Sequence, residues 1–204
     1  MRINTLRLRA MLGALGMLLP WIVVLLIGYF PDSISATWYT NACTVFMIIL
    51  GSSSVLLISY KGYEKIDDIL TTVTGIFGLG ICLFPCSPEI GLGLPLPTPF
   101  LIPHNVSNII HLFCAITFFI LLAINSFFLF TKSSGVMTKN KKIRNIIYRV
   151  CAIGMLVSFA FLLLPPFRIQ IWLVETIALA FFGISWLTKA DYYPWLFADK
   201  KETL

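Results

Sequence analysis

The chain has 204 residues, of which 58 % are hydrophobic and only 12 % are charged, and its formal net charge is +6. Soluble domains carry about 25 % charged and about 45–50 % apolar residues, so this composition excludes a water-soluble domain, a disordered chain and a disulfide-rich secreted fold. The sequence therefore predicts one all-α domain over residues 1–204, a polytopic transmembrane bundle of six helices.

Six stretches have roughly the 20 mostly apolar residues that a spanning helix needs. In chain order they are about 10–30, 38–60, 69–85, 107–131, 146–165 and 169–188. The first is longer than the apolar region of a signal peptide, about 7–15 residues, so we expect a retained helix. We expect the third, with Gly75, Gly78 and Gly80, to be central, because small residues allow close helix packing. The fourth is expected to face lipid with Phe118, Phe119, Phe127, Phe128 and Phe130.

The basic residues predict the orientation of the bundle. With six spans both termini lie on one side, and 14 of the 15 Lys and Arg residues then lie on that side, with Arg168 on the other. Such an excess is typical of cytoplasmic loops. We therefore expect both termini in the cytoplasm of a bacterial cell, and residues 190–204 to form an interfacial tail. The positive charge then needs no nucleic-acid partner. The proline-rich outer loop 86–103 either folds over the bundle or runs along the lipid.

Ionisable residues inside the spans mark candidate sites, because they are costly in a bilayer. Glu175 lies in the sixth stretch, His111 lies in the fourth, two helical turns after His104, and Asn41 lies near the outer end of the second. We expect these four residues to form an outward-facing polar cluster in which Glu175 accepts a hydrogen bond from His111. The alternative is an interhelical hydrogen bond that only stabilises packing.

Other polar residues have two interpretations each. Cys86, near Cys82 at the outer end of the third stretch, could form a disulfide with Cys43, or these cysteines could be small buried hydrophobes. Asp67 and Asp68 begin the third stretch, where a carboxylate can cap a helix or hold a cation at the inner face. No HExxH or paired-cysteine motif is present, so the sequence predicts neither a metal nor another cofactor.

Short segments spread along the chain carry a resemblance. They are Pro31-Asp32-Ser33-Ile34-Ser35, Tyr60-Lys61-Gly62-Tyr63, Asp67-Asp68, Leu83-Phe84-Pro85, His104 to His111, and Glu175 with Phe182-Gly183-Ile184-Ser185-Trp186. With them the chain resembles small bacterial six-helix membrane proteins that are loosely similar to the DRAM-like and Frag-type membrane families. This resemblance implies a fold and a location but no activity. A weaker likeness is to the ceramidase and adiponectin-receptor-like hydrolases, whose seven helices and HxxxH pair are not found in this sequence.

We therefore expect a non-enzymatic multi-pass protein of the cell membrane. It would bind membrane lipid or a small amphiphile at Glu175, His111, His104 and Asn41, or serve as a subunit of a membrane complex. Two alternatives remain open: an intramembrane lipid hydrolase that uses His104, His111 and Glu175, and a proton-coupled carrier that uses Glu175 and His111. The sequence assigns no catalytic residue.

Overall fold

The computed structural model describes residues 5–62, 64–87, 100–133, 137–163 and 171–190. Its elements in chain order are α1 (Thr5–Ile27), η1 (Ser35–Tyr39), α2 (Cys43–Ile58), α3 (Lys65–Leu83), α4 (His104–Ile124), η2 (Asn125–Leu129), α5 (Lys139–Ala160), η3 (Phe161–Leu163) and α6 (Ile171–Lys189). These described residues contain no strand, which confirms the predicted all-α fold. Most of the proline-rich loop and of the expected interfacial tail lies outside the described residues.

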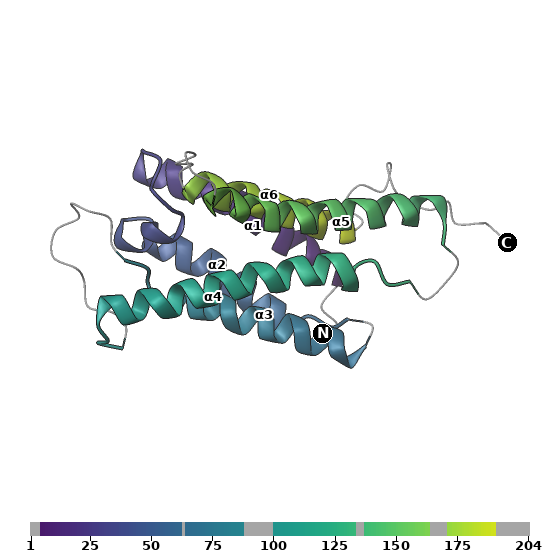
Figure 1. Ribbon diagram of the computed structural model, residues 1–204, viewed down its shortest axis with the longest axis horizontal. Helices are drawn as coiled ribbons and strands as arrows, with labels where there is room; N and C mark the ends of the chain where they lie inside the picture. Colours follow the sequence, from purple (N-terminus) through teal and green to yellow (C-terminus); the bar gives the residue numbers. More distant parts are fainter. Residues whose placement is uncertain (1–4, 63, 88–99, 134–136, 164–170, 191–204) are drawn as a thin grey trace.

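The helices form two layers (Figure 1). In one layer α6 lies between α1 and α5, and in the other α3 lies between α2 and α4. The layers meet where α1 packs on α2 and α4 packs on α5. Successive helices thus pack on one another, and α6 closes the bundle by packing on α1, which contacts α6 more extensively than it contacts α2.

In the described part of the chain, five helices are long and apolar enough to cross a membrane: α1, α3, α4 continued by η2, α5 and α6. The sequence predicted a full span over 38–60, but the structure divides this stretch into η1 and α2. Thr40 Oγ1 accepts a hydrogen bond from the Ala42 amide at 3.1 Å, and such local bonds compete with helix continuation. The remaining α2 has 16 residues, or about 24 Å, which is shorter than the about 30 Å hydrocarbon core.

Two observed helix ends differ from the ends of the predicted spans, because a polar cap or a glycine sets the boundary. α5 begins at Lys139 rather than at 146, because Thr138 caps it by accepting a hydrogen bond from the Lys141 amide at 3.1 Å. The first two turns of α5 are polar, so hydropathy alone misses them. α1 ends at Ile27 rather than at 30, because Gly28 adopts a φ of +82° that terminates the helix.

The start of α3 contains a capping box and an ion cluster. Glu64, rather than Asp67 or Asp68, is the N-cap, and its backbone amide donates to Asp67 at 3.2 Å. Lys132, which follows η2, donates to Asp67 at 2.6 Å and to Glu64 at 2.7 Å, and these two hydrogen bonds raise the pKa of its ammonium group. Asp67 is only 1 % exposed, so the cluster joins α3 to the end of α4 through a buried carboxylate.

Close backbone contacts confirm the expected role of small residues. A Cβ atom added to Gly13 of α1 would lie 2.9 Å from the carbonyl oxygen of Gly183 in α6, and one added to Gly183 would lie 2.8 Å from that of Gly13. Gly75 of α3 meets the Ser54 carbonyl of α2 in the same way. α3 is the middle helix of its own layer as predicted, but α6 is the more enclosed of the two.

The sequence suggested that the five phenylalanines of α4, η2 and the residue after it face lipid as a group, but they do not. Phe118, Phe119 and Phe130 are buried, whereas Phe128 is exposed and Phe127 lies half-buried. The helical period turns one side of α4 toward the other helices and the opposite side outward, whatever the hydrophobicity of the residues.

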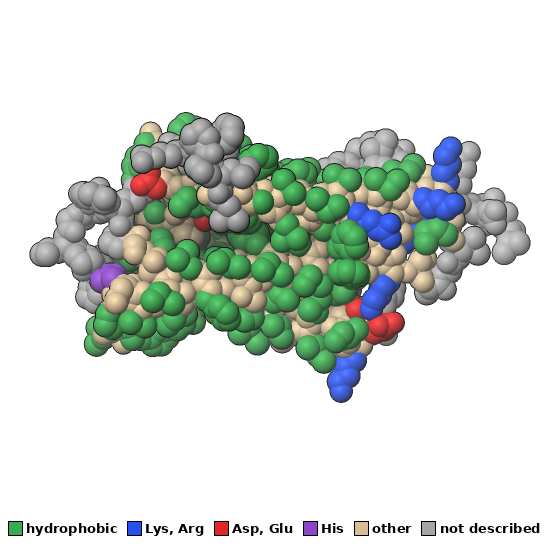
Figure 2. All heavy atoms as spheres, in the orientation of Figure 1, with side chains coloured by type: hydrophobic (Ala, Val, Ile, Leu, Met, Phe, Trp, Pro, Cys, Tyr) green, Lys and Arg blue, Asp and Glu red, His purple; other side chains and the backbone are tan. Residues whose placement is uncertain are grey.

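Charged side chains separate along the long axis of the molecule. Figure 2 shows Lys and Arg gathered at one end, which we call the basic end, while hydrophobic side chains cover the flanks. At this end Arg9 of α1 donates to the Tyr60 hydroxyl at 3.0 Å and to the Lys189 carbonyl at 3.3 Å. The gathering agrees with the sequence prediction that nearly all basic residues lie on one side. That the basic end lies on the cytoplasmic side of the membrane stays a prediction.

Candidate functional site

A cavity of about 40 Å³ lies between the two layers, away from the basic end. Its lining comes from α1, α2, α3, α4, α6 and the segment that enters η1. A single water needs only about 10–15 Å³ on this measure, so the cavity holds more than one water-sized group. Figure 2 shows a hollow between the layers in this half of the molecule.

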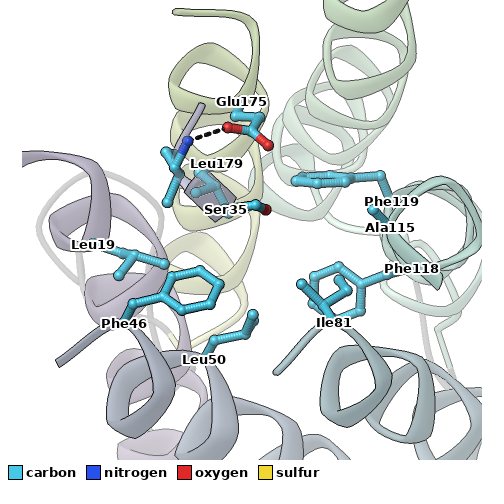
Figure 3. Close-up of a pocket in the computed structure, with 11 residues that line it drawn as sticks. Leu19, Ser35, Phe46, Leu50, Ile81, Ala115, Phe118, Phe119, Glu175 and Leu179 are labelled. Carbon is cyan, nitrogen blue, oxygen red and sulfur yellow. Dashed lines mark hydrogen bonds between the residues drawn. The ribbon is translucent and has the colours of Figure 1, made fainter. Parts of the chain in front are cut away.

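Glu175 places a carboxylate at one side of this cavity. It lies in the second turn of α6 and is half-buried, and its Oε2 accepts a hydrogen bond from the Ile34 amide at 2.6 Å. The Trp172 amide, in the first turn of α6, donates to the Asp32 carbonyl at 2.8 Å. The segment 32–35 therefore docks on the start of α6 and fixes the carboxylate (Figure 3). Among the described residues, no Lys, Arg or His pairs with Glu175.

The rest of the cavity is almost entirely hydrocarbon. Figure 3 shows the Ser35 side chain near Glu175, while Phe46 of α2 and Phe118 and Phe119 of α4 form aromatic walls. Leu19 of α1, Leu50 of α2 and Leu179 of α6 complete the walls around them. One carboxylate and one hydroxyl above an apolar space make an amphipathic site.

His111 lies elsewhere, although the sequence placed it beside Glu175. Its side chain is 4 % exposed, and Nδ1 bonds to the carbonyl oxygen of Phe84 at 2.8 Å, just beyond the end of α3. The expected hydrogen bond between Glu175 and His111 is therefore not formed among the described residues. His111 instead satisfies a backbone group that the end of a helix leaves unpaired.

The segment that follows α3, residues 84–87, forms a hydrogen bond to a side chain through a backbone group of each residue. Beyond Phe84, these bonds run from Ser107 Oγ to the Pro85 carbonyl (2.8 Å), from the Tyr39 hydroxyl to the Cys86 carbonyl (2.6 Å), and from the Ser87 amide to Asn108 Oδ1 (2.9 Å). Burial and, secondarily, the nearby Cys86 raise the pKa of Tyr39 to about 12, so its hydroxyl keeps its proton at neutral pH. Together with His111, these residues form an anchor for an irregular segment whose backbone groups must be satisfied within the protein.

His104 and Asn41 also lie apart from Glu175. His104 begins α4, three residues before the predicted start at 107, and its Nδ1 lies 3.4 Å from the Tyr39 hydroxyl. Asn41 is exposed, and its side chain donates to the Leu26 carbonyl at 3.1 Å, at the end of α1. Of the four residues in the predicted cluster, the structure places only Glu175 at the cavity.

Of the two interpretations of the cysteines, the structure shows no disulfide: all five, including Cys43, Cys82 and Cys86, are free thiols. Within the described part of the chain, no group of three His, Cys, Asp or Glu side chains could hold a metal ion. The chemistry of the cavity therefore depends on Glu175 and Ser35.

Replacing His111 with alanine tests the anchor. The change leaves the carbonyl of the half-buried Phe84 without its His111 partner, so we expect the free energy of unfolding to fall by about 1–3 kcal/mol. Because His111 does not line the cavity, ligand binding there should persist. Unfolding in mixed micelles measures the first effect, and the binding assay described below measures the second. A folded His111→Ala protein that loses binding would place His111 in the site after all.

Sequence reasoning found Glu175 because a carboxylate in a spanning segment is rare. It missed Ser35 and the aromatic walls Phe46, Phe118 and Phe119. The segment Pro31-Asp32-Ser33-Ile34-Ser35 carried the available signal, since proline, aspartate and serine favour turns that present backbone amides. The aromatic residues carried no such signal, because lipid-facing and cavity-facing phenylalanines look alike in a sequence.

The site thus consists of the Glu175 carboxylate, which the Ile34 amide holds at the edge of an apolar cavity and which has no cationic partner among the described residues. Comparisons with protein-family models, with curated proteins and with solved structures found no match.

Proposed function

We propose that this is a multi-pass membrane protein that binds a small amphiphile with a cationic head group at Glu175. The single observation that carries the proposal is the half-buried Glu175 carboxylate, which faces an apolar cavity without a described cationic partner. A charge in such surroundings is unfavourable unless an opposite charge or hydrogen-bond donors compensate it. A bound ammonium group would supply this compensation.

The basic end supports one orientation of the protein in the membrane. Since basic residues concentrate in cytoplasmic loops, we place the basic end, with both termini, in the cytoplasm of a bacterial cell. The cavity then lies in the outer half of the membrane and takes its ligand from the outer leaflet or the outer solution.

The walls of the cavity favour a ligand with an alkyl chain. The aromatic faces of Phe46, Phe118 and Phe119 attract both hydrocarbon and alkylammonium groups. A cavity of about 40 Å³ accommodates a head group but not a whole lipid, so the chain must follow the hollow between the layers. Primary alkylamines match this combination of charge and shape.

The test uses n-octylamine, which is cationic at neutral pH, and octanoate, which has the same chain and the opposite charge. We expect octylamine to bind nanodiscs that contain the protein more tightly than it binds empty nanodiscs. Octanoate should bind the two kinds of nanodisc equally. Glu175→Gln should weaken octylamine binding by about tenfold, because a hydrogen bond to a charged group contributes about 1.5–3 kcal/mol. Titration calorimetry measures both ligands.

Glu64→Gln is the matched control, since it removes a carboxylate at the basic end, far from the cavity along α3. It should leave octylamine binding unchanged. Equal octylamine affinity in Glu175→Gln and the unmodified protein would refute the proposal, as would equal binding of octanoate. The interpretations as a lipid hydrolase, a proton-coupled carrier or a complex subunit stay predictions from the sequence.

A further inference from the structure

An apolar groove of about 260 Å³ runs along the outside of the bundle, between α4 with η2 on one side and α5 on the other. Its floor contains two buried small residues, Ala123 of α4 and Ala152 of α5. Its rim contains exposed side chains such as Phe128, Ile153 and Leu156. A buried floor with an exposed apolar rim is open to the hydrocarbon of the membrane.

A cation stands at one end of this groove. Arg149 precedes Ala152, Ile153 and Leu156 by three, four and seven residues, so all four lie along one face of α5. The Arg149 guanidinium carbon lies 5.6 Å from the ring centre of Phe127, which lines the groove. Arg149 is exposed, and among the described residues no carboxylate forms an ion pair with it.

The position of Arg149 corresponds to the head-group level at the basic end. Its partner Phe127 lies in η2, only two residues before the end of the spanning segment His104–Leu129. Lys142, two turns earlier on the same face of α5, is also exposed and adds a second positive charge. From Arg149 to Leu156 the groove extends about 10 Å into the hydrocarbon, at 1.5 Å per residue.

From this arrangement we infer that the groove binds an anionic phospholipid of the leaflet at the basic end. One acyl chain lies between α4 and α5, and the phosphate meets Arg149. The groove is larger than an apolar cavity of about 150 Å³ that binds benzene, so its size suits a segment of alkyl chain. Basic residues beside spanning helices attract anionic head groups, and arginine pairs with phosphate through two parallel hydrogen bonds.

This lipid site is independent of the cavity at Glu175. Among the described residues the two share no lining residue: on α4 the cavity is lined by Ala115, Phe118 and Phe119, whereas the groove lining begins at Ile120 and continues into η2. The experiment therefore uses a different ligand. Native mass spectrometry of the detergent-solubilised protein, after addition of phosphatidylglycerol or of the zwitterionic phosphatidylcholine, counts the lipids that stay bound.

We expect the unmodified protein to retain one phosphatidylglycerol and to retain phosphatidylcholine much less. Arg149→Gln should lower the retained phosphatidylglycerol by about tenfold. The matched control is Arg144→Gln, which removes one positive charge from the same helix. Five residues correspond to about 140° around the helix, so this charge lies on another face and its removal should have little effect.

Three results would overturn the inference. They are retention of phosphatidylglycerol by Arg149→Gln, an equal loss with Arg144→Gln, and displacement of the lipid by excess glycerol phosphate, which has the anionic group without acyl chains. The last result would indicate a site for free anions. Because Arg149 is exposed, we expect its variant to fold, and the helical circular dichroism signal checks this.

Discussion

Replacing Asp67 with alanine is expected to lower the free energy of unfolding by about 3 kcal/mol. The Asp67 side chain is 2 % exposed, and it accepts from Lys132 at 2.6 Å and from the Glu64 amide at 3.2 Å. The substitution removes both bonds, so the first turn of α3 loses half of its capping box and Lys132 loses its buried partner. Unfolding by SDS in mixed micelles, followed by circular dichroism, measures the change.

The neighbouring Asp68 supplies the control. Its side chain is 29 % exposed and pairs with Lys61, which is 73 % exposed, and it also accepts from the Gly62 amide at 2.8 Å. Exposed ion pairs contribute little to stability. Asp68→Ala should therefore destabilise the protein clearly less than Asp67→Ala. An equal loss of stability in both variants would show that the buried Asp67–Lys132 pair contributes no more to stability than the exposed Asp68–Lys61 pair.

Replacing Gly183 with valine should lower the free energy of unfolding by about 3 kcal/mol, at the upper end of the usual cost of overpacking. A Cβ atom on Gly183 would meet the Met17 side chain and would lie 2.8 Å from the Gly13 carbonyl oxygen. The methionine can move, but the carbonyl oxygen moves only if α1 shifts away from α6. The same unfolding titration detects the loss.

Gly51→Val is the matched control for this contact. Gly51 lies inside α2, and a Cβ atom there would meet nothing within 4 Å. The valine at 51 therefore has space, and only its helix propensity changes. A Gly183→Val protein as stable as Gly51→Val would show that α1 and α6 do not pack through these glycines.

Most of the fold follows from the sequence because a bilayer imposes a simple rule. Backbone groups in hydrocarbon must be satisfied within a helix, so long apolar stretches predict helices. This reasoning located the five helices that are long enough to cross. It misjudged helix ends such as Lys139 and Ile27, where Thr138 and Gly28 decide the boundary, and it did not foresee the break at Thr40.

The candidate site was predicted only in part, because its geometry depends on how the layers meet. Glu175 is recognisable as a carboxylate in a spanning segment, but its partner is a backbone amide, that of Ile34, which sequence reasoning cannot select. His111 is recognisable as a buried histidine, yet its partner Phe84 becomes available only because α3 ends at Leu83. The inward or outward direction of Phe118 and Phe128 is hidden for another reason: lipid and protein interior are equally apolar.

The most direct test of the central claim is photolabelling with an octylamine that carries a diazirine on its alkyl chain, followed by peptide mass spectrometry. We expect labelling in the segments of α2 and α4 that contain Phe46, Phe118 and Phe119, competition by octylamine, and loss of this labelling in Glu175→Gln. Labelling that is confined to lipid-facing residues, or that persists unchanged in Glu175→Gln, would contradict binding at Glu175.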